Sequence, residues 1–399
     1  MRSNLLATAI VIGLGLAAVA PARAADDTAA QLAAMKAQIA ALQAQLEELQ
    51  SRTDAQSEVN VTQAKAIEAA QATNTKADAL EKLVNNTKFS GRMYYDFSHI
   101  DAESNGVNTS ATGTGFDIKR FYLGVDHKFN DIWSMNLTTD FQYSSAIGST
   151  EVYLKKAYLE GNFSKAFDLR LGSTDLPWVP FAENAYGYRY VENTLVDRLK
   201  YGTSADWGVH VSGASDSGMF NYAAAMINGA GYKNPSRSKS VDFEGRIGFM
   251  PVEGLTLAVG GYTGKLGKET ETVDVPHTAK RFDALAAYAT PNFRIGAEYF
   301  SATDWNVAQV DEDKADGYSV FGNVALGGNG INLFARYDSA KTSKDIDPSL
   351  KNTYYNIGVE FPVIKGLKIA PVYKYTRLEN DTGVDQVTKE LGMWGEFRF

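Results

Sequence analysis

Apolar and polar residues alternate with a period of two from about residue 88 to the end of the chain. In the final stretch, Leu391, Met393 and Phe397 fall on one face of a strand, and Glu396 and Arg398 fall on the other. A strand with lipid on one side and a watery lumen on the other needs this alternation. A soluble edge strand with exposed phenylalanines would instead invite aggregation. The pattern therefore predicts that this stretch is the closing strand of a barrel.

The same alternation recurs along the chain and defines sixteen segments. They cover residues 89–98, 116–129, 133–143, 151–163, 167–173, 206–214, 219–227, 241–249, 255–263, 281–289, 292–301, 317–326, 331–339, 353–361, 367–377 and 387–399. An even number is required when both ends of a closed antiparallel barrel lie on one side of the membrane. In 281–289 the outer face is ambiguous, because Phe282, Ala284 and Tyr288 compete for it with Leu285 and Ala287. Residues 87–399 are therefore predicted to form an all-β, 16-stranded antiparallel transmembrane β-barrel.

Short turns alternate with longer polar loops between these segments. Short turns belong on the periplasmic side, and the last segment ends there, so the first segment must start there as well. The longest connector, residues 174–205, contains Trp178 and a run of tyrosines. A connector of this length is usually functional or disordered, and its aromatic content favours order. We expect it to fold inward and narrow the channel; the alternative is an ordinary extracellular lid.

A different period precedes the barrel. Apolar residues spaced alternately by three and four positions form an a/d heptad seam, and they are Leu32, Met35, Ile39, Leu42, Leu46 and Leu49. The seam continues with polar residues such as Asn60, which cost stability and fix the register or the number of chains. Residues 25–86 are therefore predicted to form an α-helical coiled-coil stalk in the periplasm, and a single helix over residues 27–84 would be roughly 87 Å long at ~1.5 Å per residue. The alternative is a solvated helix packed on the barrel.

Residues 1–24 combine Arg2, an apolar run and small residues at Ala22 and Ala24, which is the pattern of a secretory signal peptide. Removing Arg2 and Arg23 with this segment changes the formal charge from −8 to −10, which argues against nucleic acid as a partner. The overall charge does not decide ion selectivity, because the field of a pore depends on the few charges at its narrowest point.

Little in the sequence indicates catalysis. The chain has no cysteine and only 4 histidines, which excludes disulfides and thiolate chemistry and leaves little for a metal cluster. His210 and Ser212 share one face of a strand, but no G-x-S-x-G elbow accompanies them. We therefore expect no enzyme activity, no catalytic residues, no cofactor and no metal site.

Several motifs resemble those of a known family, the phosphate-selective porins O and P. Besides the leader, the stalk and the terminal Phe399, these are Gly115–Gly124 (GFDIKRFYLG), Trp133, Leu137–Phe141 (LTTDF), Leu154–Tyr158 (LKKAY) and Arg170–Gly172 (RLG). The resemblance covers most of residues 88–399. It implies a trimeric, sixteen-stranded channel of the Gram-negative outer membrane, in which a ladder of arginines draws anions to a constriction lined by lysines and arginines. A terminal phenylalanine also resembles the signal that the barrel-assembly machinery reads.

Basic residues that face the lumen or lie in the long connector are the candidates for pore lining and selectivity. They are Arg92, Arg120, Lys156, Arg170, Arg189, Arg198, Lys200, Arg246, Arg294 and Arg336. Nearly equal numbers of acidic residues share the lumen face, and cross-strand pairs of opposite charge are common on barrel walls. The residues alone therefore leave open which charges act on a permeating ion.

The resulting interpretation is an outer-membrane porin, a passive diffusion channel for small hydrophilic solutes or ions, with anion or phosphate preference as one form of it. Its expected partners are outer-membrane lipid, two further copies of the chain in a homotrimer, and the assembly machinery. The alternative is a structural barrel whose stalk is a spacer that tethers it towards peptidoglycan.

Overall fold

The computed structural model describes residues 26–144 and 149–399. The signal peptide predicted over residues 1–24 lies outside the described residues. The chain divides into two compact units, one up to Glu81 and one from Lys82 onward, and each is described by itself.

The first unit is a single long helix. Helix α1 (Asp26–Asn86) has 61 residues, which gives it a length of about 90 Å at ~1.5 Å per residue. Its seam is open to solvent, since Leu32, Met35, Ile39 and Leu42 are between 53% and 61% exposed. The predicted helix is confirmed, whereas its assembly into a coiled coil remains a prediction.

Among the helices of the described residues, none combines the length and the apolar character needed to cross a bilayer.

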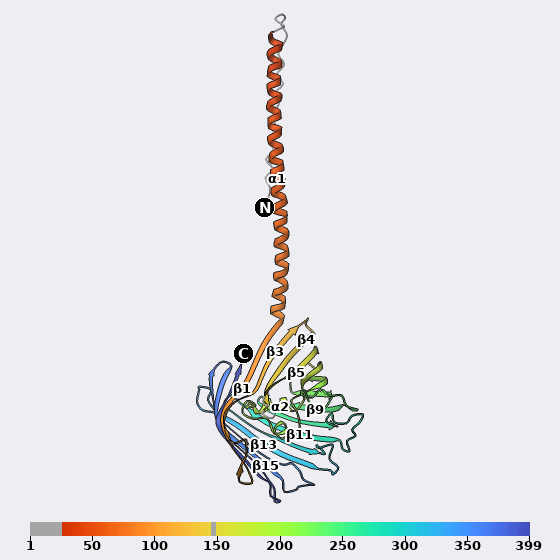
Figure 1. Ribbon diagram of the computed structural model, residues 1–399, viewed down its shortest axis with the longest axis vertical. Helices are drawn as coiled ribbons and strands as arrows, with labels where there is room; N and C mark the ends of the chain where they lie inside the picture. The colour runs from red at the N-terminus through yellow and green to blue at the C-terminus, as the bar shows by residue number, and fades with distance from the viewer. Residues whose placement is uncertain (1–25, 145–148) are drawn as a thin grey trace. The chain divides into compact units, whose positions relative to one another are not determined.

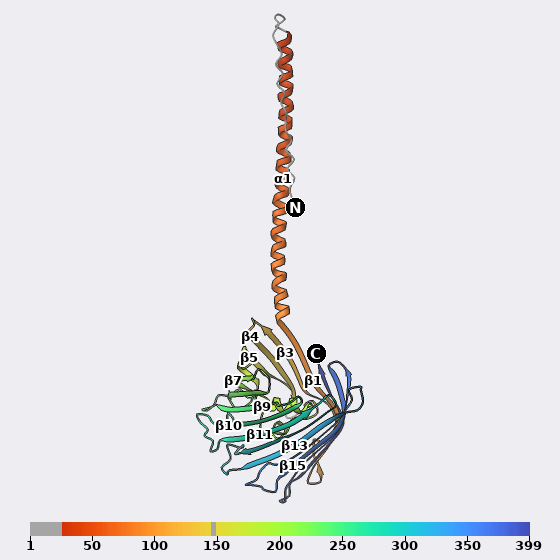
Figure 2. The ribbon, with the colours of Figure 1, turned by 180° about the vertical axis from the view of Figure 1, so that it is seen from behind.

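The second unit is a closed antiparallel β-barrel of sixteen long strands (Figures 1 and 2). The strands are β1 (Thr87–Ser104), β3 (Gly113–Lys128), β4 (Trp133–Ser144), β5 (Ser149–Ser164), β6 (Phe167–Asp175), β7 (Ala205–Ala214), β8 (Phe220–Ile227), β9 (Asp242–Phe249), β10 (Leu255–Gly264), β11 (Ala279–Ala289), β12 (Phe293–Thr303), β13 (Lys314–Ala325), β14 (Asn332–Lys341), β15 (Lys351–Ile364), β16 (Leu367–Glu379) and β17 (Asp385–Arg398). Each predicted segment corresponds to one of them, so the predicted fold class is confirmed. A two-residue strand, β2 (Val107–Asn108), pairs back onto β1 in the first loop.

The barrel closes between its first and last strands. β1 and β17 pair from Arg92↔Arg398 to Ser104↔Gln386. The Phe399 N–H donates to the Gly91 carbonyl at 3.1 Å, and the Gly91 N–H donates to the Phe399 carbonyl at 3.2 Å. The Phe399 ring lies over Gly91, where a Cβ atom would collide with it. The last residue therefore extends the closing ladder, and glycine at position 91 makes room for its ring.

Strand β11 resolves the one ambiguous segment. Phe282 is 49% exposed on the outer wall, and Tyr288 on the same face is 39% exposed. Asp283 and Leu285 are buried on the inner wall. The outer face of 281–289 therefore carries Phe282, Ala284 and Tyr288 rather than Leu285 and Ala287, because inner-wall packing takes the latter pair.

Candidate functional site

The connector between β6 and β7, residues 176–204, forms two short helices. Helix α2 (Val179–Tyr186) has Pro180 in its first turn, where a missing N–H costs little. It ends at Gly187, whose φ of 83° suits glycine and whose N–H donates to the Glu183 carbonyl at 2.8 Å. Helix α3 (Leu195–Arg198) follows. In Figure 1, α2 lies within the ring of strands.

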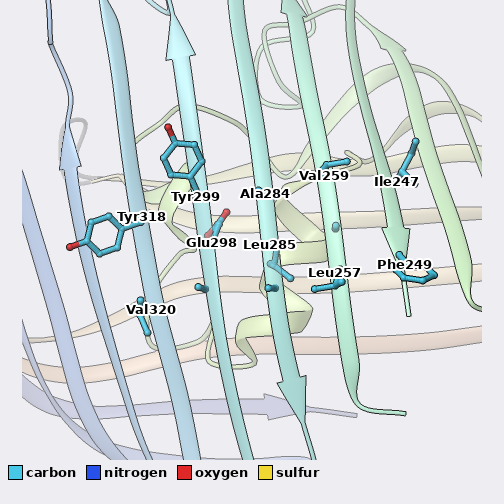
Figure 3. Close-up of a pocket in the computed structure, with 13 residues that line it drawn as sticks. Ile247, Phe249, Leu257, Val259, Ala284, Leu285, Glu298, Tyr299, Tyr318 and Val320 are labelled. Carbon is cyan, nitrogen blue, oxygen red and sulfur yellow. The ribbon is translucent and has the colours of Figure 1, made fainter. Parts of the chain in front are cut away.

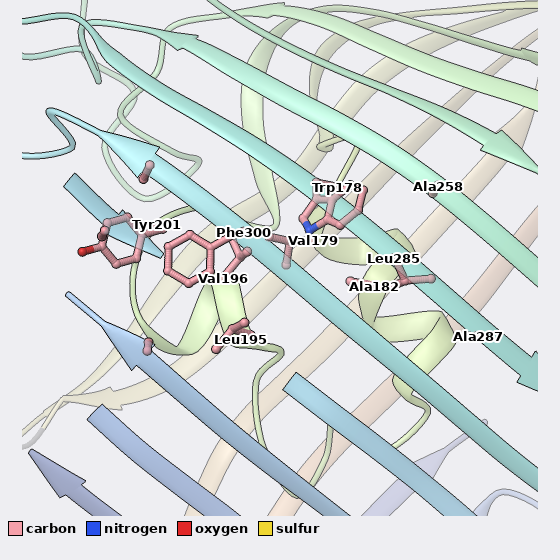
Figure 4. Close-up of a cluster of buried hydrophobic side chains, with 13 residues drawn as sticks. Trp178, Val179, Ala182, Leu195, Val196, Tyr201, Ala258, Leu285, Ala287 and Phe300 are labelled. Carbon is pink, nitrogen blue, oxygen red and sulfur yellow. The ribbon is translucent and has the colours of Figure 1, made fainter. Parts of the chain in front are cut away.

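The first set of loop contacts is apolar and joins both helices to the inner wall (Figure 4). Trp178, Leu195 and Val196 are fully buried beside Phe300 and the alanines of strands β10 to β14. The Trp178 indole N–H donates to one carboxylate oxygen of Glu298 at 3.0 Å, and the Leu195 N–H donates to the other at 3.3 Å. A buried wall carboxylate is thus satisfied by the loop, as buried polar groups must be.

The second set of loop contacts is aromatic. The Tyr188 ring stacks on Phe334 with a centroid distance of 4.1 Å, and the Tyr190 hydroxyl donates to Glu360 at 2.9 Å. Tyr186 and Trp394 belong to the same buried cluster, which reaches β17 and β1. The loop therefore covers the inner wall from β10 round to β1, and its predicted inward fold is confirmed.

Charged groups also hold the loop. Arg336 on β14 donates to the Asn193 carbonyl at 2.5 Å and pairs with Asp338 at 2.6 Å. Arg198 of the loop reaches the same Asp338 at 3.0 Å. This carboxylate is buried between two guanidinium groups, so removal of either arginine would leave part of its charge uncompensated.

Glu192 connects the loop to two distant strands. Its carboxylate lies 3.4 Å from the ammonium of Lys119 on β3 and 3.3 Å from that of Lys374 on β16. Burial alone would raise the pKa of Glu192, but the two lysines outweigh it and hold the pKa well below its usual range. Glu192 is therefore ionised at neutral pH and fastens the loop across the lumen.

The other side of the lumen is open. A cavity of about 900 Å³ lies between α2 and the inner wall, lined by Pro180 and Asn184 on the helix and by Tyr122 and Thr138 on the wall. Its charged lining residues are Arg92, Lys155, Lys156, Asp175, Glu183, Lys365 and Arg398. Five of these side chains are basic and two are acidic, so the cavity carries a basic excess.

Two β-bulges bring extra lysines to the inner wall, and the one at Lys155 contributes to that excess. The β1–β3 register shifts opposite Tyr94 and Tyr95 and leaves Lys119 as the extra residue. The β4–β5 register shifts opposite Thr138 and Thr139 and leaves Lys155 as the extra residue. A bulge adds one residue to a strand and leaves it unpaired in the ladder. Lys119 and Lys155 consequently join their chain neighbours at the lumen.

Regular alternation did not predict these two lysines. In each strand the signal was that two successive outward apolar residues are three positions apart instead of two. They are Ile118 and Phe121 on β3, and Leu154 and Ala157 on β5. Arg281 on β11 was missed for another reason, because it lies in the segment whose face was ambiguous. Its side chain is fully buried against Glu244 and Asp283.

The predicted site residues separate into three groups. Four are part of the inward loop or hold it. Of these, Arg189 pairs with Glu183 at 2.5 Å, Arg198 and Arg336 share Asp338, and Lys200 accepts a hydrogen bond from the Trp305 indole through its backbone carbonyl at 2.9 Å.

A second group of four lies on the inner wall in ion pairs. These pairs are Arg92–Glu396 at 3.5 Å, Arg120–Asp140 at 3.8 Å, Lys156–Asp175 at 2.5 Å and Arg170–Glu160 at 2.7 Å. Their charges are therefore largely compensated within the wall.

The third group has no carboxylate partner. Over residues 26–144 and 149–399, no side-chain carboxylate lies within 4 Å of the basic groups of Arg246 or Arg294, nor of Lys155, Lys365 or Arg398. Arg246 donates to the Pro177 carbonyl at 3.0 Å and lies 3.9 Å from the centre of the Phe181 ring. These five cations therefore keep a positive charge that no side-chain carboxylate among the described residues compensates at close range.

Comparison with known proteins bears on the nature of this barrel. The model of the family described as phosphate-selective porin O and P matches residues 87–275. The resemblance to the phosphate-selective porins O and P is confirmed. No curated protein matches the chain.

Solved structures show the porin fold. An anion-selective porin from Comamonas acidovorans aligns with a TM-score of 0.59 at 12% identity, covering 78% of this chain and 99% of that one. The outer membrane channel DcaP of Acinetobacter baumannii aligns with a TM-score of 0.58 at 11% identity, covering 78% and 97%. OprB of Pseudomonas putida aligns with a TM-score of 0.56 at 11% identity, covering 82% and 96%. Family match and porin fold together support an outer-membrane channel.

Proposed function

We propose that the barrel is a passive diffusion channel that prefers small anions over cations. Solutes would pass through the cavity between α2 and the inner wall of β1, β3, β4 and β5. The inward loop would set the size limit, and the uncompensated cations would set the charge preference. The pore-lining roles of the ten predicted basic residues are part of this proposal.

The observation that carries the proposal is the pairing of charges along the cavity. Asp175 and Glu183 are its acidic lining side chains, and each is bound to a basic group at 2.5 Å. Among the described residues, Lys155, Lys365 and Arg398 line the same cavity without a side-chain carboxylate within 4 Å. An anion entering the cavity would meet basic side chains that no carboxylate side chain neutralises, whereas a cation would meet acidic side chains that are already bound to basic groups.

A planar-bilayer recording under a potassium chloride gradient tests the proposal. We expect a reversal potential on the anion side. A reversal potential on the cation side would refute the anion preference, and absence of conductance would refute the channel. Addition of phosphate separates the two forms of the proposal, because a block of the chloride current indicates a phosphate-preferring pore and an unchanged current a general anion pore.

We also propose that residues 25–86 form a periplasmic coiled coil in a homotrimer. The exposed seam of α1 supports this, because an isolated helix would leave that apolar stripe in water. Deletion of residues 25–86 is expected to weaken the trimer without abolishing it, as measured by the temperature at which trimers dissociate on a gel. Complete loss of trimers would mean that contacts between barrels contribute little.

A further inference from the structure

A shallow groove crosses the outer wall of the barrel on strands β9 to β13 (Figure 3). It has a volume of about 530 Å³. Its floor consists of small residues on adjacent strands, with Ala286 and Ala297 directly opposite each other in the ladder. Ile247, Val259 and Tyr318 are among the larger side chains that border it. The groove is therefore apolar and open to the surroundings of the barrel.

Lysines lie on the same outer wall, towards the long loops. Lys280 is on β11, on the same face as Ala284 and four residues nearer the loops. Lys341 on β14 and Lys351 on β15 are direct partners in the ladder. All three side chains are exposed, and none has a carboxylate within 4 Å among the described residues. Like charges directly opposite each other destabilise a sheet, so Lys341 and Lys351 form a pair that an external anion would stabilise.

The carboxylates nearest to this pair in the ladder are engaged elsewhere. Asp316 is the ladder partner of Lys341 but is bound by Lys344. Glu379 is the ladder partner of Lys351 but lies 3.0 Å from Arg377. The two ammonium groups are thus left for a ligand from outside the chain.

The outer wall changes in a fixed order towards these lysines. Apolar residues are followed by a row of directly paired tyrosines, Tyr337, Tyr355 and Tyr375. Ser339 and Thr353 come next, and the two lysines follow, about 13 Å beyond the tyrosines at ~3.3 Å per residue. Acyl chains, the interface and the headgroup phosphates of a lipid leaflet succeed one another in this same order.

We propose that this face binds a phosphate-bearing lipid of the surrounding leaflet, with an acyl chain in the groove and headgroup phosphate at Lys341 and Lys351. Tyr318 borders the groove and is the ladder partner of Ser339, two residues from Lys341. Headgroup and chain sites are therefore continuous. Lys280 provides a further cation above the floor of the groove. The positive charges of these lysines favour a phosphate-bearing lipid over a second barrel as the occupant, because a second barrel would have to present carboxylates opposite the lysines.

Titration of the delipidated, detergent-solubilised full-length protein with lipid A, followed by native mass spectrometry, tests the proposal. Diphosphorylated lipid A is expected to bind, and inorganic phosphate is not expected to displace it. The double variant Lys341→Gln/Lys351→Gln should bind about 30-fold more weakly, from the contribution of two lysines near a charged lipid surface. Lys268→Gln, which removes a charge from an exposed loop, is the matched control and should bind normally.

A second variant tests the groove. Ala286→Trp is expected to fill it and weaken lipid A binding, while trimer content and conductance stay unchanged. Equal binding by the wild type and the double lysine variant would overturn the proposal, as would equal binding of lipid A stripped of its phosphates. Loss of trimers in Ala286→Trp would also overturn it, by identifying a second copy of the chain as the occupant. Because conductance is measured on the same samples, failure of the lipid site is distinguishable from failure of the channel.

Discussion

The cation at Lys155 offers the sharpest test of charge selection in this lumen. Its ammonium lies 4.5 Å from the centre of the Tyr122 ring and has no carboxylate partner within 4 Å among the described residues. We consider the variant Lys155→Gln, which keeps a polar side chain of similar length and removes one charge. Because the residue is the extra one of a bulge, the ladder on either side needs no other change.

The magnitude follows from Coulomb's law. A monovalent anion passing at ~5 Å gains roughly 0.8 kcal/mol from one charge in bulk water and roughly 3 kcal/mol at an effective dielectric constant of ~20. Even the smaller figure corresponds to about a fourfold change in the local concentration of anions. Salt screens this interaction, so the effect should be largest at low ionic strength.

The assay is the reversal potential in a planar bilayer, measured for the wild type, Lys155→Gln and Lys155→Arg. We expect the glutamine variant to move towards cation selectivity and the arginine variant to stay near the wild type. Lys341→Gln removes the same charge from the outer wall and should leave the reversal potential unchanged. Equal reversal potentials for the wild type and Lys155→Gln at low salt would show that ions do not pass this cavity.

Two further predictions concern the loop and the pH dependence of the pore. Trp178→Ala should lower the stability of the packed loop by about 3–5 kcal/mol, the usual cost of truncating a fully buried tryptophan. Barrels of this variant that still fold should give a larger and noisier single-channel current. Burial and the neighbouring Arg120 lower the pKa of Lys233, in the loop between β8 and β9, to about 8. Raising the pH from 7 to 9 should therefore remove a positive charge near the loop-side entrance and reduce anion selectivity, and Lys233→Gln should abolish this change between those two pH values.

The barrel could be predicted from the sequence because its dominant constraint is local. Lipid on one side and water on the other impose a period of two on every strand, whichever strands are its neighbours. Phe97 on β1 and Leu391 on β17 are partly exposed on the outer wall, as their alternation predicts. The alternation became ambiguous only in β11, where Leu285 and Ala287 pack against the inward loop. At those two positions the inner face is as apolar as the outer one, so the alternation does not show which face points to the lipid.

The candidate site was less predictable because it depends on partners far away in the chain. Arg336 and Arg246 are both lumen-facing arginines in sequence terms. In the folded barrel Arg336 is buried against Asp338 and the loop, whereas Arg246 has no carboxylate partner in the part of the chain that the structure describes. Which arginine is paired with a carboxylate depends on the path of residues 176–204 across the inner wall, and no spacing within one strand encodes that path.

The distribution of partners also explains how a chain with more acidic than basic residues can line a basic cavity. Loop and wall use carboxylates as structural groups, since Glu298 accepts two hydrogen bonds from the loop and Asp338 joins two arginines. Each carboxylate used in this way is withdrawn from the field that an ion meets. The bulge at Lys155 acts in the opposite sense, because it brings to the lumen a lysine that has no carboxylate partner among the described residues, while the outward apolar residues keep their places. In the channel we propose, selectivity therefore depends on the uncompensated charges beside the loop, and the formal charge of −8 gives no guide to its sign.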